Sequence, residues 1–344
     1  MLLLRQDLLI KDPALALPSK KESTLGQLNK FHALKKLFPI NLPIVQAGMV
    51  WASGAKLASA CANEGALGLI GAGSMKPELL QQHIQKAKSL TSAPERLGVN
   101  VPLLYERSKE QIDVALKEDI NIFFTSAGSP KKYTQYLKDH GAKVIHVTSS
   151  PDLAIKCENA GVDGVVAEGF EAGGHNGRDE TTTMALIPSV VDAVSIPVIA
   201  AGGIGNGRQI LAALSLGASG VQMGTRFLMS NESSAHKSYK KLLSQTRAGD
   251  TELVMKQHVP VRLVKNQFYE EIKVLENKGA NTSVIIEHLG KGRAKAGMLE
   301  GDLENGELEA GQICGQIEKI QSVKEIFLEI NQEFDAIYNA LKLG

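Results

Sequence analysis

The stretch PVIAAGGIGNG (residues 197–207) decides the fold. A short apolar run ends in two glycines and leads into NGRQILAALSLGA (206–218), whose apolar residues recur with helical spacing. The run is apolar at successive rather than alternating positions, which indicates a strand covered on both faces, as in a parallel sheet. Strand, glycine turn and helix in this order form one βα unit.

The same unit recurs along most of the chain. Strand-like apolar runs that end in Gly, Ala, Ser or Asn occur at residues 43–48, 67–73, 97–101, 121–127, 143–149, 164–169, 197–203 and 220–225. Helix-like segments separate them. Eight such units over about 200 residues predict an α/β fold, a closed (β/α)8 TIM barrel. A doubly wound open sheet, which needs fewer strands, ranks second.

The flanks of the barrel pattern differ from it and suggest three parts. Residues 1–40 show no strand pattern, and we interpret them as a loosely attached N-terminal extension. Residues 41–244 form the barrel. Residues 245–344 have helical periodicity, interrupted by Gly-rich turns, and are expected to form a C-terminal helical cap packed on the barrel. The helical segments expected there are 266–279, 281–292, 308–320 and 323–343.

Composition restricts the class of partner. Lys and Arg number 38 against 37 Asp and Glu, a net charge of +1, so no overall field attracts nucleic acid or a membrane surface. No run approaches the roughly 18 apolar residues of a membrane-spanning helix. The three cysteines (Cys61, Cys157, Cys314) are widely spaced, so we expect buried thiols and no metal site. The expected location is the cytoplasm, with no nucleic-acid or membrane partner.

A phosphate site is predicted at the last two strand ends. TIM barrels place active sites at the carboxyl ends of their strands and often bind phosphate in the loops after strands 7 and 8. Those loops contain Gly202, Gly203, Gly224 and Thr225. Exposed backbone N–H groups, with a helix N-terminus behind them, can bind a phosphate without a lysine. The alternative interpretation is that they are merely tight βα turns.

Other strand ends suggest a planar ring over the barrel mouth. Gly48 with Met49, and Gly71 with Gly73, offer flat backbone after strands 1 and 2. Asn100, in strand 3, offers both a donor and an acceptor to a ring edge. A phosphate at strands 7 and 8 and a ring at strands 1 to 3 together fit flavin mononucleotide (FMN).

The loop after strand 6, EGFEAGGHNG (168–177), surrounds one histidine with glycines. His175 is the expected catalytic residue, because an imidazole at the barrel mouth can act as a general acid or base near neutral pH. Glu168 and Glu171 could orient His175 or hydrogen-bond the cofactor, and the sequence leaves both roles open. His146, within strand 5, is interpreted as a hydrogen-bonded core residue.

These motifs resemble those of a known family. PIVQAGM, GLGLIGAG, GVNVPLL, VAEGFEAGGHNG, PVIAAGGI and GVQMGTRF are similar to the hallmarks of the nitronate monooxygenase (2-nitropropane dioxygenase-like) superfamily of FMN barrels. Within it, AGMVWASG, VPVRLVKNQF and EGDLENGELEAGQICGQI look most like segments of the flavin-dependent enoyl-acyl-carrier-protein reductases. The resemblance covers about residues 40–320.

The resemblance implies a site and a reaction. FMN would be bound by Gly48, Met49, Asn100, Gly173, Gly174, Gly202, Gly203, Gly224 and Thr225, with His175 near its ring. NADH or NADPH would supply hydride for reduction of a trans-2-enoyl thioester in fatty-acid synthesis. The alternative is a nitronate monooxygenase that oxidises alkyl nitronates with oxygen. A third hypothesis, a flavin-holding sensor without turnover, leaves His175 without a task.

The carrier protein suggests a further expectation. An acyl carrier protein is acidic, so its docking patch would be basic, and Lys291, Arg293 and Lys295 form the densest cluster outside the N-terminal part. Arg262 and Lys265 are the next candidates. The alternative is an ordinary turn in which cations stabilise a helix C-terminus. The oligomeric state, monomer or homodimer, stays open.

Overall fold

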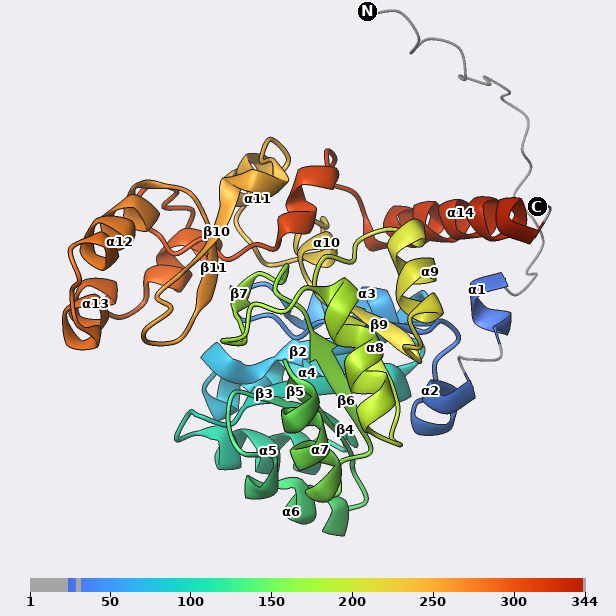
Figure 1. Cartoon of the computed structure of the whole chain (residues 1–344). Coiled ribbons are helices and arrows are strands. Elements are labelled where there is room, and N and C mark those ends of the chain that lie inside the picture. The colour runs from blue at the N-terminus through green and yellow to red at the C-terminus, as the bar shows by residue number, and fades with distance from the viewer. Residues whose placement is uncertain (1–23, 29–31, 343–344) are drawn as a thin grey trace, which may run out of the picture.

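A closed barrel of eight parallel strands forms the centre of the computed structural model, which describes residues 24–28 and 32–342 (Figure 1). Neighbouring strands follow chain order, and the ring closes where the last strand pairs with the first, with Val45 opposite Gln222. This confirms the predicted (β/α)8 barrel. The strands are β1 (Ile44–Gln46), β2 (Leu67–Gly71), β3 (Leu97–Pro102), β4 (Ile122–Ser126), β5 (Lys143–Thr148), β6 (Gly164–Glu168), β8 (Val198–Ala201) and β9 (Gly220–Met223).

Helices surround the strands on the outside of the barrel. They are α3 (Ala55–Asn63), α4 (Pro77–Leu90), α5 (Ser108–Lys117), α6 (Thr134–Asp139), α7 (Pro151–Asn159), α8 (Thr183–Ala193), α9 (Gly207–Ser215) and α14 (Val323–Lys342). The last of these, α14, packs against α9 and α3 (Figure 1). At Gly207 an added Cβ would lie 2.4 Å from the backbone N of Phe334, so the two helices touch closely. We therefore propose that α14 be grouped with the barrel rather than with the cap.

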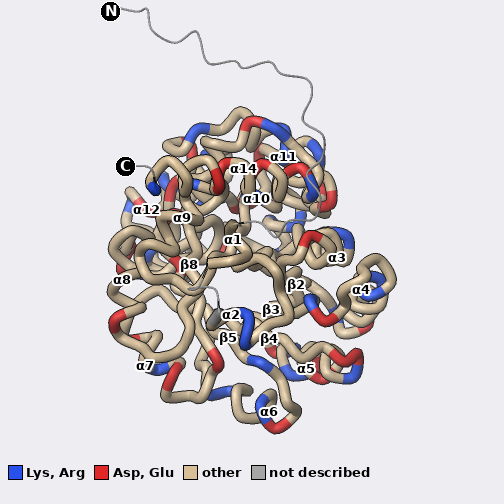
Figure 2. Tube along the Cα trace, turned by 90° about the vertical axis from the view of Figure 1, so that its right-hand side faces the viewer, with Lys and Arg blue, Asp and Glu red and all other residues tan. Residues whose placement is uncertain are grey.

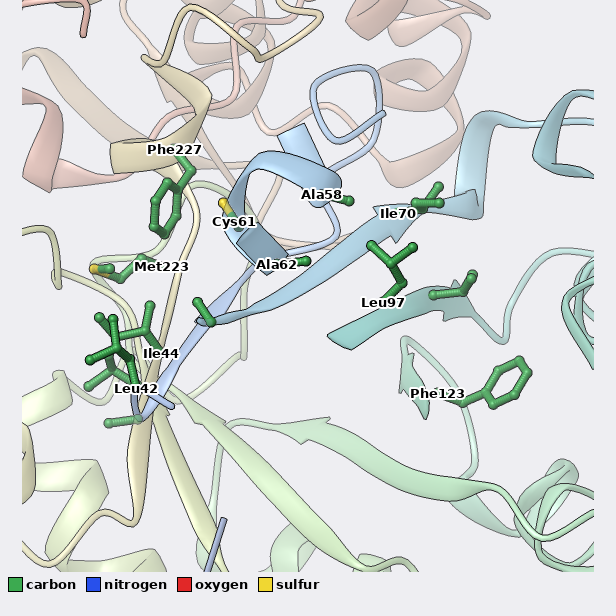
Figure 3. Close-up of a cluster of buried hydrophobic side chains, with 14 of the residues drawn as sticks. Leu42, Ile44, Ala58, Cys61, Ala62, Ile70, Leu97, Phe123, Met223 and Phe227 are labelled. Atoms are coloured by element: carbon green, nitrogen blue, oxygen red, sulfur yellow. The ribbon is translucent and has the colours of Figure 1, made fainter. Parts of the chain in front are cut away.

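Apolar side chains fill both sides of the strands. Inside the barrel, alternate positions such as Leu67 and Leu69, or Ile122 and Phe124, form one buried cluster. The intervening positions point outward to the helices. Figure 3 shows part of that outer layer, where Ala58, Cys61 and Ala62 of α3 lie among strand residues. Burial on both faces explains why the strands are continuously apolar in sequence.

The segment before the barrel closes its N-terminal end. Short helices α1 (Thr24–Gln27) and α2 (His32–Leu37) precede β1, and in Figure 2 α2 lies across the centre of the ring of helices. Leu34, Phe38 and Ile40 are buried in the cluster inside the barrel. We therefore propose that the barrel unit begins near residue 32 rather than 41. The remainder of the expected extension, residues 1–23 and 29–31, lies outside the described residues.

The cap contains a small sheet that the sequence did not suggest. Strands β10 (Thr251–Val254) and β11 (Val261–Val264) form an antiparallel hairpin, and β7 (Gly174–His175) pairs with β11. The expected helical cap thus also contains strands, which the sequence did not reveal because four-residue strands are too short to show a clear period. Within residues 308–320 the structure has only a short 3-10 helix, η7 (Gln312–Gln316), instead of the longer helix expected there.

Two short helices, α10 (Thr225–Leu228) and α11 (Lys237–Leu243), follow β9 and lead into the cap. The cap itself also contains α12 (Gln267–Asn277) and α13 (Thr282–Leu289). Lys and Arg positions alternate with Asp and Glu positions along the trace in the view of Figure 2. Among the described residues, no helix combines the length and apolarity needed to cross a membrane.

Candidate active site

A cavity lies at the carboxyl ends of the barrel strands, between the barrel and the cap. Its volume is about 620 Å³, including its open mouth. Strand-end residues form one wall and cap residues the other. It is lined by Ala47, Met49, Glu168, Glu171, Ala172, Gly173, Ala201, Gly202, Gly203, Ile204, Gln222, Gly224, Thr225, Leu228, Met298, Glu309, Gly311 and Ile313. The structure thus brings together Met49, Gly173 and the four residues of the predicted phosphate loops.

Unpaired backbone donors mark the two predicted phosphate loops. Among the described residues, the N–H groups of Gly203 and Ile204, after β8, donate to no acceptor. The same holds for Gly224 and Thr225 after β9, and all four residues line the cavity. The hydroxyl oxygen of Thr225 accepts from the Gly311 N–H at 3.0 Å, so its own proton is free to donate. Several N–H groups converging on one cavity are what an anion such as phosphate requires.

The helix after β8 adds less to this site than expected. At its start, the Asn206 side chain accepts from the Gln209 N–H at 3.1 Å. The Gly207 N–H donates to Oε2 of Glu333 at 2.8 Å. These partners already satisfy the first donors of α9, so an anion in the cavity would be held by loop N–H groups rather than by this helix end. A carboxylate from α14 therefore already binds the helix N-terminus that was expected to stand behind the phosphate.

The predicted ring-binding glycines pack strand ends against one another. An added Cβ at Gly48 would lie 2.4 Å from Cβ of Asn100, and one at Gly71 would lie 2.4 Å from the Met49 carbonyl oxygen. Among the described residues, the cavity lining does not include Gly48, Gly71, Gly73, Asn100 or Gly174. Close contact between the ends of β1, β2 and β3 therefore requires these glycines, whatever else they do.

The loop that carries His175 is fastened to the cap. Gly174 and His175 form β7, with His175 opposite Val261 of β11. An added Cβ at Gly173 would lie 2.5 Å from the backbone carbonyl carbon of Ala310, and Gly174 has a φ of +74°. Both glycines are therefore needed, one for close approach and one for its left-handed backbone. This explains the glycines around the histidine.

The imidazole of His175 is exposed at the barrel mouth, although the cavity lining does not include it. Loss of hydration among surrounding protein atoms lowers its pKa, while the nearby Glu307 carboxylate opposes that shift. His146 behaves differently. It is buried in β5, with Nδ1 2.7 Å from Oγ1 of Thr125, and burial lowers its pKa to about 4. The interpretation of His146 as a hydrogen-bonded core residue is confirmed.

The two glutamates of the loop have separate surroundings. Glu171 holds the start of α8, because its carboxylate accepts from the N–H and the hydroxyl of Thr183. Glu168 lines the cavity, and burial raises its pKa to about 7. The sequence did not single out two further carboxylates, Glu307 and Glu309. Their segment, EGDLENGELEAGQICGQI, was noted only for its resemblance to the enoyl-acyl-carrier-protein reductases. Burial raises the pKa of both, and Glu309 lines the cavity.

Two of the three residues of the expected basic patch, Arg293 and Lys295, make contacts within the protein. The guanidinium of Arg293 donates to the carbonyl oxygens of His288, Leu289 and Asn305, so it holds the end of α13. Lys295 pairs with Glu300. Arg262 is 1% exposed and donates to the Phe170 carbonyl oxygen, so its candidacy as a docking residue was wrong.

The chain is similar to known proteins over most of its length. The nitronate monooxygenase family model matches residues 32–111 and 95–333. A solved structure of FabK from Thermotoga maritima is 39% identical, with a TM-score of 0.85 over 90% of this chain and 97% of that chain. A probable nitronate monooxygenase of Bacillus subtilis is 33% identical over 87% of this chain and 97% of its own length. An octahydro-indene-carboxyl-CoA dehydrogenase of Mycobacterium tuberculosis is 30% identical over 86% and 94%.

Proposed function

Because this chain belongs to the nitronate monooxygenase family of flavin oxidoreductases, we propose that it is an FMN- and NAD(P)H-dependent reductase of trans-2-enoyl thioesters. The observation that carries the proposal is the set of free N–H groups at Gly203, Ile204, Gly224 and Thr225 on one cavity wall. They fit the phosphate of a mononucleotide cofactor without any cationic side chain.

The residues of the cavity fit FMN in two ways. The two glycine loops would hold its phosphate, and Met49 with Gly173 would contact its ring system from the barrel and the loop after β6. When bound, the flavin would supply hydride transfer from a reduced nicotinamide to the substrate. Met298 and Ile313 of the cap, together with Leu228, form apolar parts of the wall and would exclude water from the reacting atoms.

His175 would donate the proton that this reaction requires. Reduction of the enoyl double bond adds a hydride at the β-carbon and a proton at the α-carbon, so one group at the site must deliver a proton. The imidazole stands at the mouth on β7, an edge strand whose pairing with β11 limits its movement. Its lowered pKa makes it neutral at pH 7, so it would act by donating its ring N–H.

The choice of a thioester substrate rests on similarity. FabK of Thermotoga maritima is a solved relative that fits the enoyl-acyl-carrier-protein reductase resemblance in the sequence, and the mycobacterial relative is named for a carboxyl-CoA substrate. Both relatives support an acyl thioester as the substrate. We propose acyl carrier protein as the carrier that presents this thioester to the chain. We propose the cytoplasm as the site of action, as expected for fatty-acid synthesis.

A second candidate activity has support from the relatives. The Bacillus subtilis protein is a probable nitronate monooxygenase, and the same cavity and histidine could serve oxidation of a nitronate. One assay series separates the two. Purified protein is given crotonyl-N-acetylcysteamine with NADH or NADPH, and separately propionate-3-nitronate with oxygen. Thioester-dependent oxidation of the nicotinamide supports the reductase, whereas nitronate-dependent oxygen consumption alone would replace it with the monooxygenase.

A further inference from the structure

Two carboxyl groups beside His175 have no role in the function proposed above. Glu307 is 8% exposed, and Glu309 lies on the cavity wall. Within the described chain, neither carboxyl group accepts a hydrogen bond or forms an ion pair. A buried carboxylate without a partner costs several kcal/mol, so such a group is normally neutral or charged only against a ligand.

Backbone pairing places the pair next to the catalytic loop. Along one edge of β11, His175 stands opposite Val261, and Glu309 forms a bridge with Leu263. Gly174 lies between them, opposite Arg262. An added Cβ at Gly174 would be 2.6 Å from Oε2 of Glu309, so this carboxyl group touches the His175 strand. Figure 1 shows β7 beside β10 and β11, where these elements meet.

The charges around the cluster favour a proton on the carboxyl pair. Burial raises the pKa of both glutamates, and repulsion from Glu309 raises the pKa of Glu307 further. For His175, loss of hydration among the surrounding protein atoms has the opposite effect and lowers its pKa. At neutral pH the mobile proton therefore belongs to the carboxyl pair, while the imidazole is neutral.

Other charged or titratable groups near the pair do not replace it. Arg293 lowers the pKa of Glu307, but its guanidinium is committed to backbone carbonyl oxygens. The Tyr239 hydroxyl donates to the backbone oxygen of Glu309, not to its carboxyl group. Tyr105 has a raised pKa, mainly from burial and also from the two glutamates, so it keeps its proton.

We propose that Glu307 and Glu309 hold one proton between them and supply it, through neutral His175, to the α-carbon of the reduced substrate. This inference rests on the proposed enoyl reduction. Hydride derived from the nicotinamide forms the new bond at the β-carbon, and the π electrons of the double bond take the imidazole N–H proton at the α-carbon. No hydrogen bond joins the imidazole to either carboxyl group within the described chain, so the carboxyl O–H proton passes by way of water to the other ring nitrogen of the exposed imidazole, and bulk water restores the proton to the pair. Glu307 and Glu309 are thus proton-holding residues that act through His175.

The first test measures the proton directly. Infrared spectra of the purified protein at pH 7 should contain the C=O stretching band of a protonated carboxylic acid. The band should shrink in Glu307→Gln and in Glu309→Gln, and by more in the double variant. Glu304→Gln, at an exposed glutamate of the same segment, should leave it unchanged. Glu168 has a raised pKa too, so Glu168→Gln is measured in parallel to assign its part of the band.

The second test measures the pH dependence of turnover. Glu307→Gln removes one negative charge beside Glu309 and His175, so the alkaline limb of kcat should move about one pH unit lower. On that limb the rate would fall roughly tenfold, with KM for crotonyl-N-acetylcysteamine unchanged. In the double variant Glu307→Gln with Glu309→Gln, the decline of kcat at alkaline pH that the pair causes should disappear. A residue with only a packing role would change stability or KM without moving the limb.

The outcomes separate this inference from the function beneath it. If the Glu307 and Glu309 variants keep the full acid band of the wild type, the proton-holding pair is overturned. Superimposable pH profiles of kcat for the wild type and the variants would overturn it as well. If the wild-type protein reduces no enoyl thioester, the proposed function fails. The infrared band still shows in that case whether the pair holds its proton.

Discussion

Both carboxylate oxygens of Glu171 accept hydrogen bonds from Thr183, the first residue of α8. The distances from the Thr183 N–H group to the two oxygens are 3.1 and 2.9 Å, and the hydroxyl donates to Oε2 at 2.8 Å. The same side chain lies against Gly203, where an added Cβ would be 3.3 Å from Cβ of Glu171. One glutamate therefore ties the His175 loop to a barrel helix and to a predicted phosphate loop.

Glu171→Ala should destabilise the protein by about 1–2 kcal/mol, because the start of α8 loses its capping carboxylate. Urea denaturation followed by circular dichroism measures the loss. Asp179→Asn, at an exposed position in the same loop, serves as the control and should unfold like the wild type. Equal midpoints for Glu171→Ala and the wild type would show that the cap contributes nothing.

Gly203→Asp should abolish retention of FMN. The new carboxylate would add negative charge to a loop that is proposed to hold the phosphate, and it would repel that group. Gly203 also has a φ of +68°, so Gly203→Ala is the control that carries the backbone strain without the charge. Flavin absorbance of the purified proteins measures retention, and riboflavin binding gives a second reading. The aspartate should weaken FMN binding far more than riboflavin binding, and equal losses would place the phosphate elsewhere.

His175→Ala should keep the fold and the flavin but slow turnover by about 10²–10⁴-fold, the range for loss of a proton-transfer group. The side chain is exposed, so its removal leaves no buried cavity. Steady-state kcat with crotonyl-N-acetylcysteamine and NAD(P)H measures the effect. Normal kinetics would remove His175 from the mechanism, whichever substrate proves to be the right one.

Stability should fall on acidification through the buried His146. Its pKa is about 4 in the folded protein, below the ordinary value of 6.5, so the unfolded chain binds its proton first. The stabilisation is therefore complete above pH 6.5 and is lost as the pH falls from there toward 4. Between pH 7 and pH 5 the loss should be roughly 1–2 kcal/mol.

His146→Gln tests this assignment by urea denaturation at several pH values. The variant should lack this part of the pH dependence, whereas His140→Gln, at an exposed histidine on the barrel surface, should keep it. An unchanged pH dependence in His146→Gln would assign the acid sensitivity to other groups.

Charge reversal of Lys291 and Lys295 tests carrier docking without disturbing the end of α13. Lys291→Glu with Lys295→Glu should raise KM for an enoyl group on acyl carrier protein and reduce the salt dependence of that KM. KM for crotonyl-N-acetylcysteamine should stay nearly constant. Arg293 is left in place because its guanidinium holds three backbone carbonyl groups. If neither KM changes, the carrier docks elsewhere or is not the partner.

The sequence by itself determined the barrel and the wall of the cavity that the barrel provides. Continuous apolar runs such as 197–201 identify strands covered on both faces, and glycine pairs such as Gly202–Gly203 follow them at the strand ends. Period and turn chemistry are local properties of the chain, so each βα unit can be located from its own residues. Closure of eight such units then placed Gly203 and Gly224 on one cavity.

Only the tertiary structure decided the other wall and its chemistry. The pairing of β7 with β11, two and four residues long, has no readable period, yet it fastens His175 to the cap. Glu307 and Glu309 are far from His175 in the chain and reach it only through that sheet. Their raised pKa values come from burial, which depends on how the cap covers the barrel and cannot be inferred from neighbouring residues. Local sequence patterns determine the helices and strands, whereas long-range packing determines which side chains are buried together.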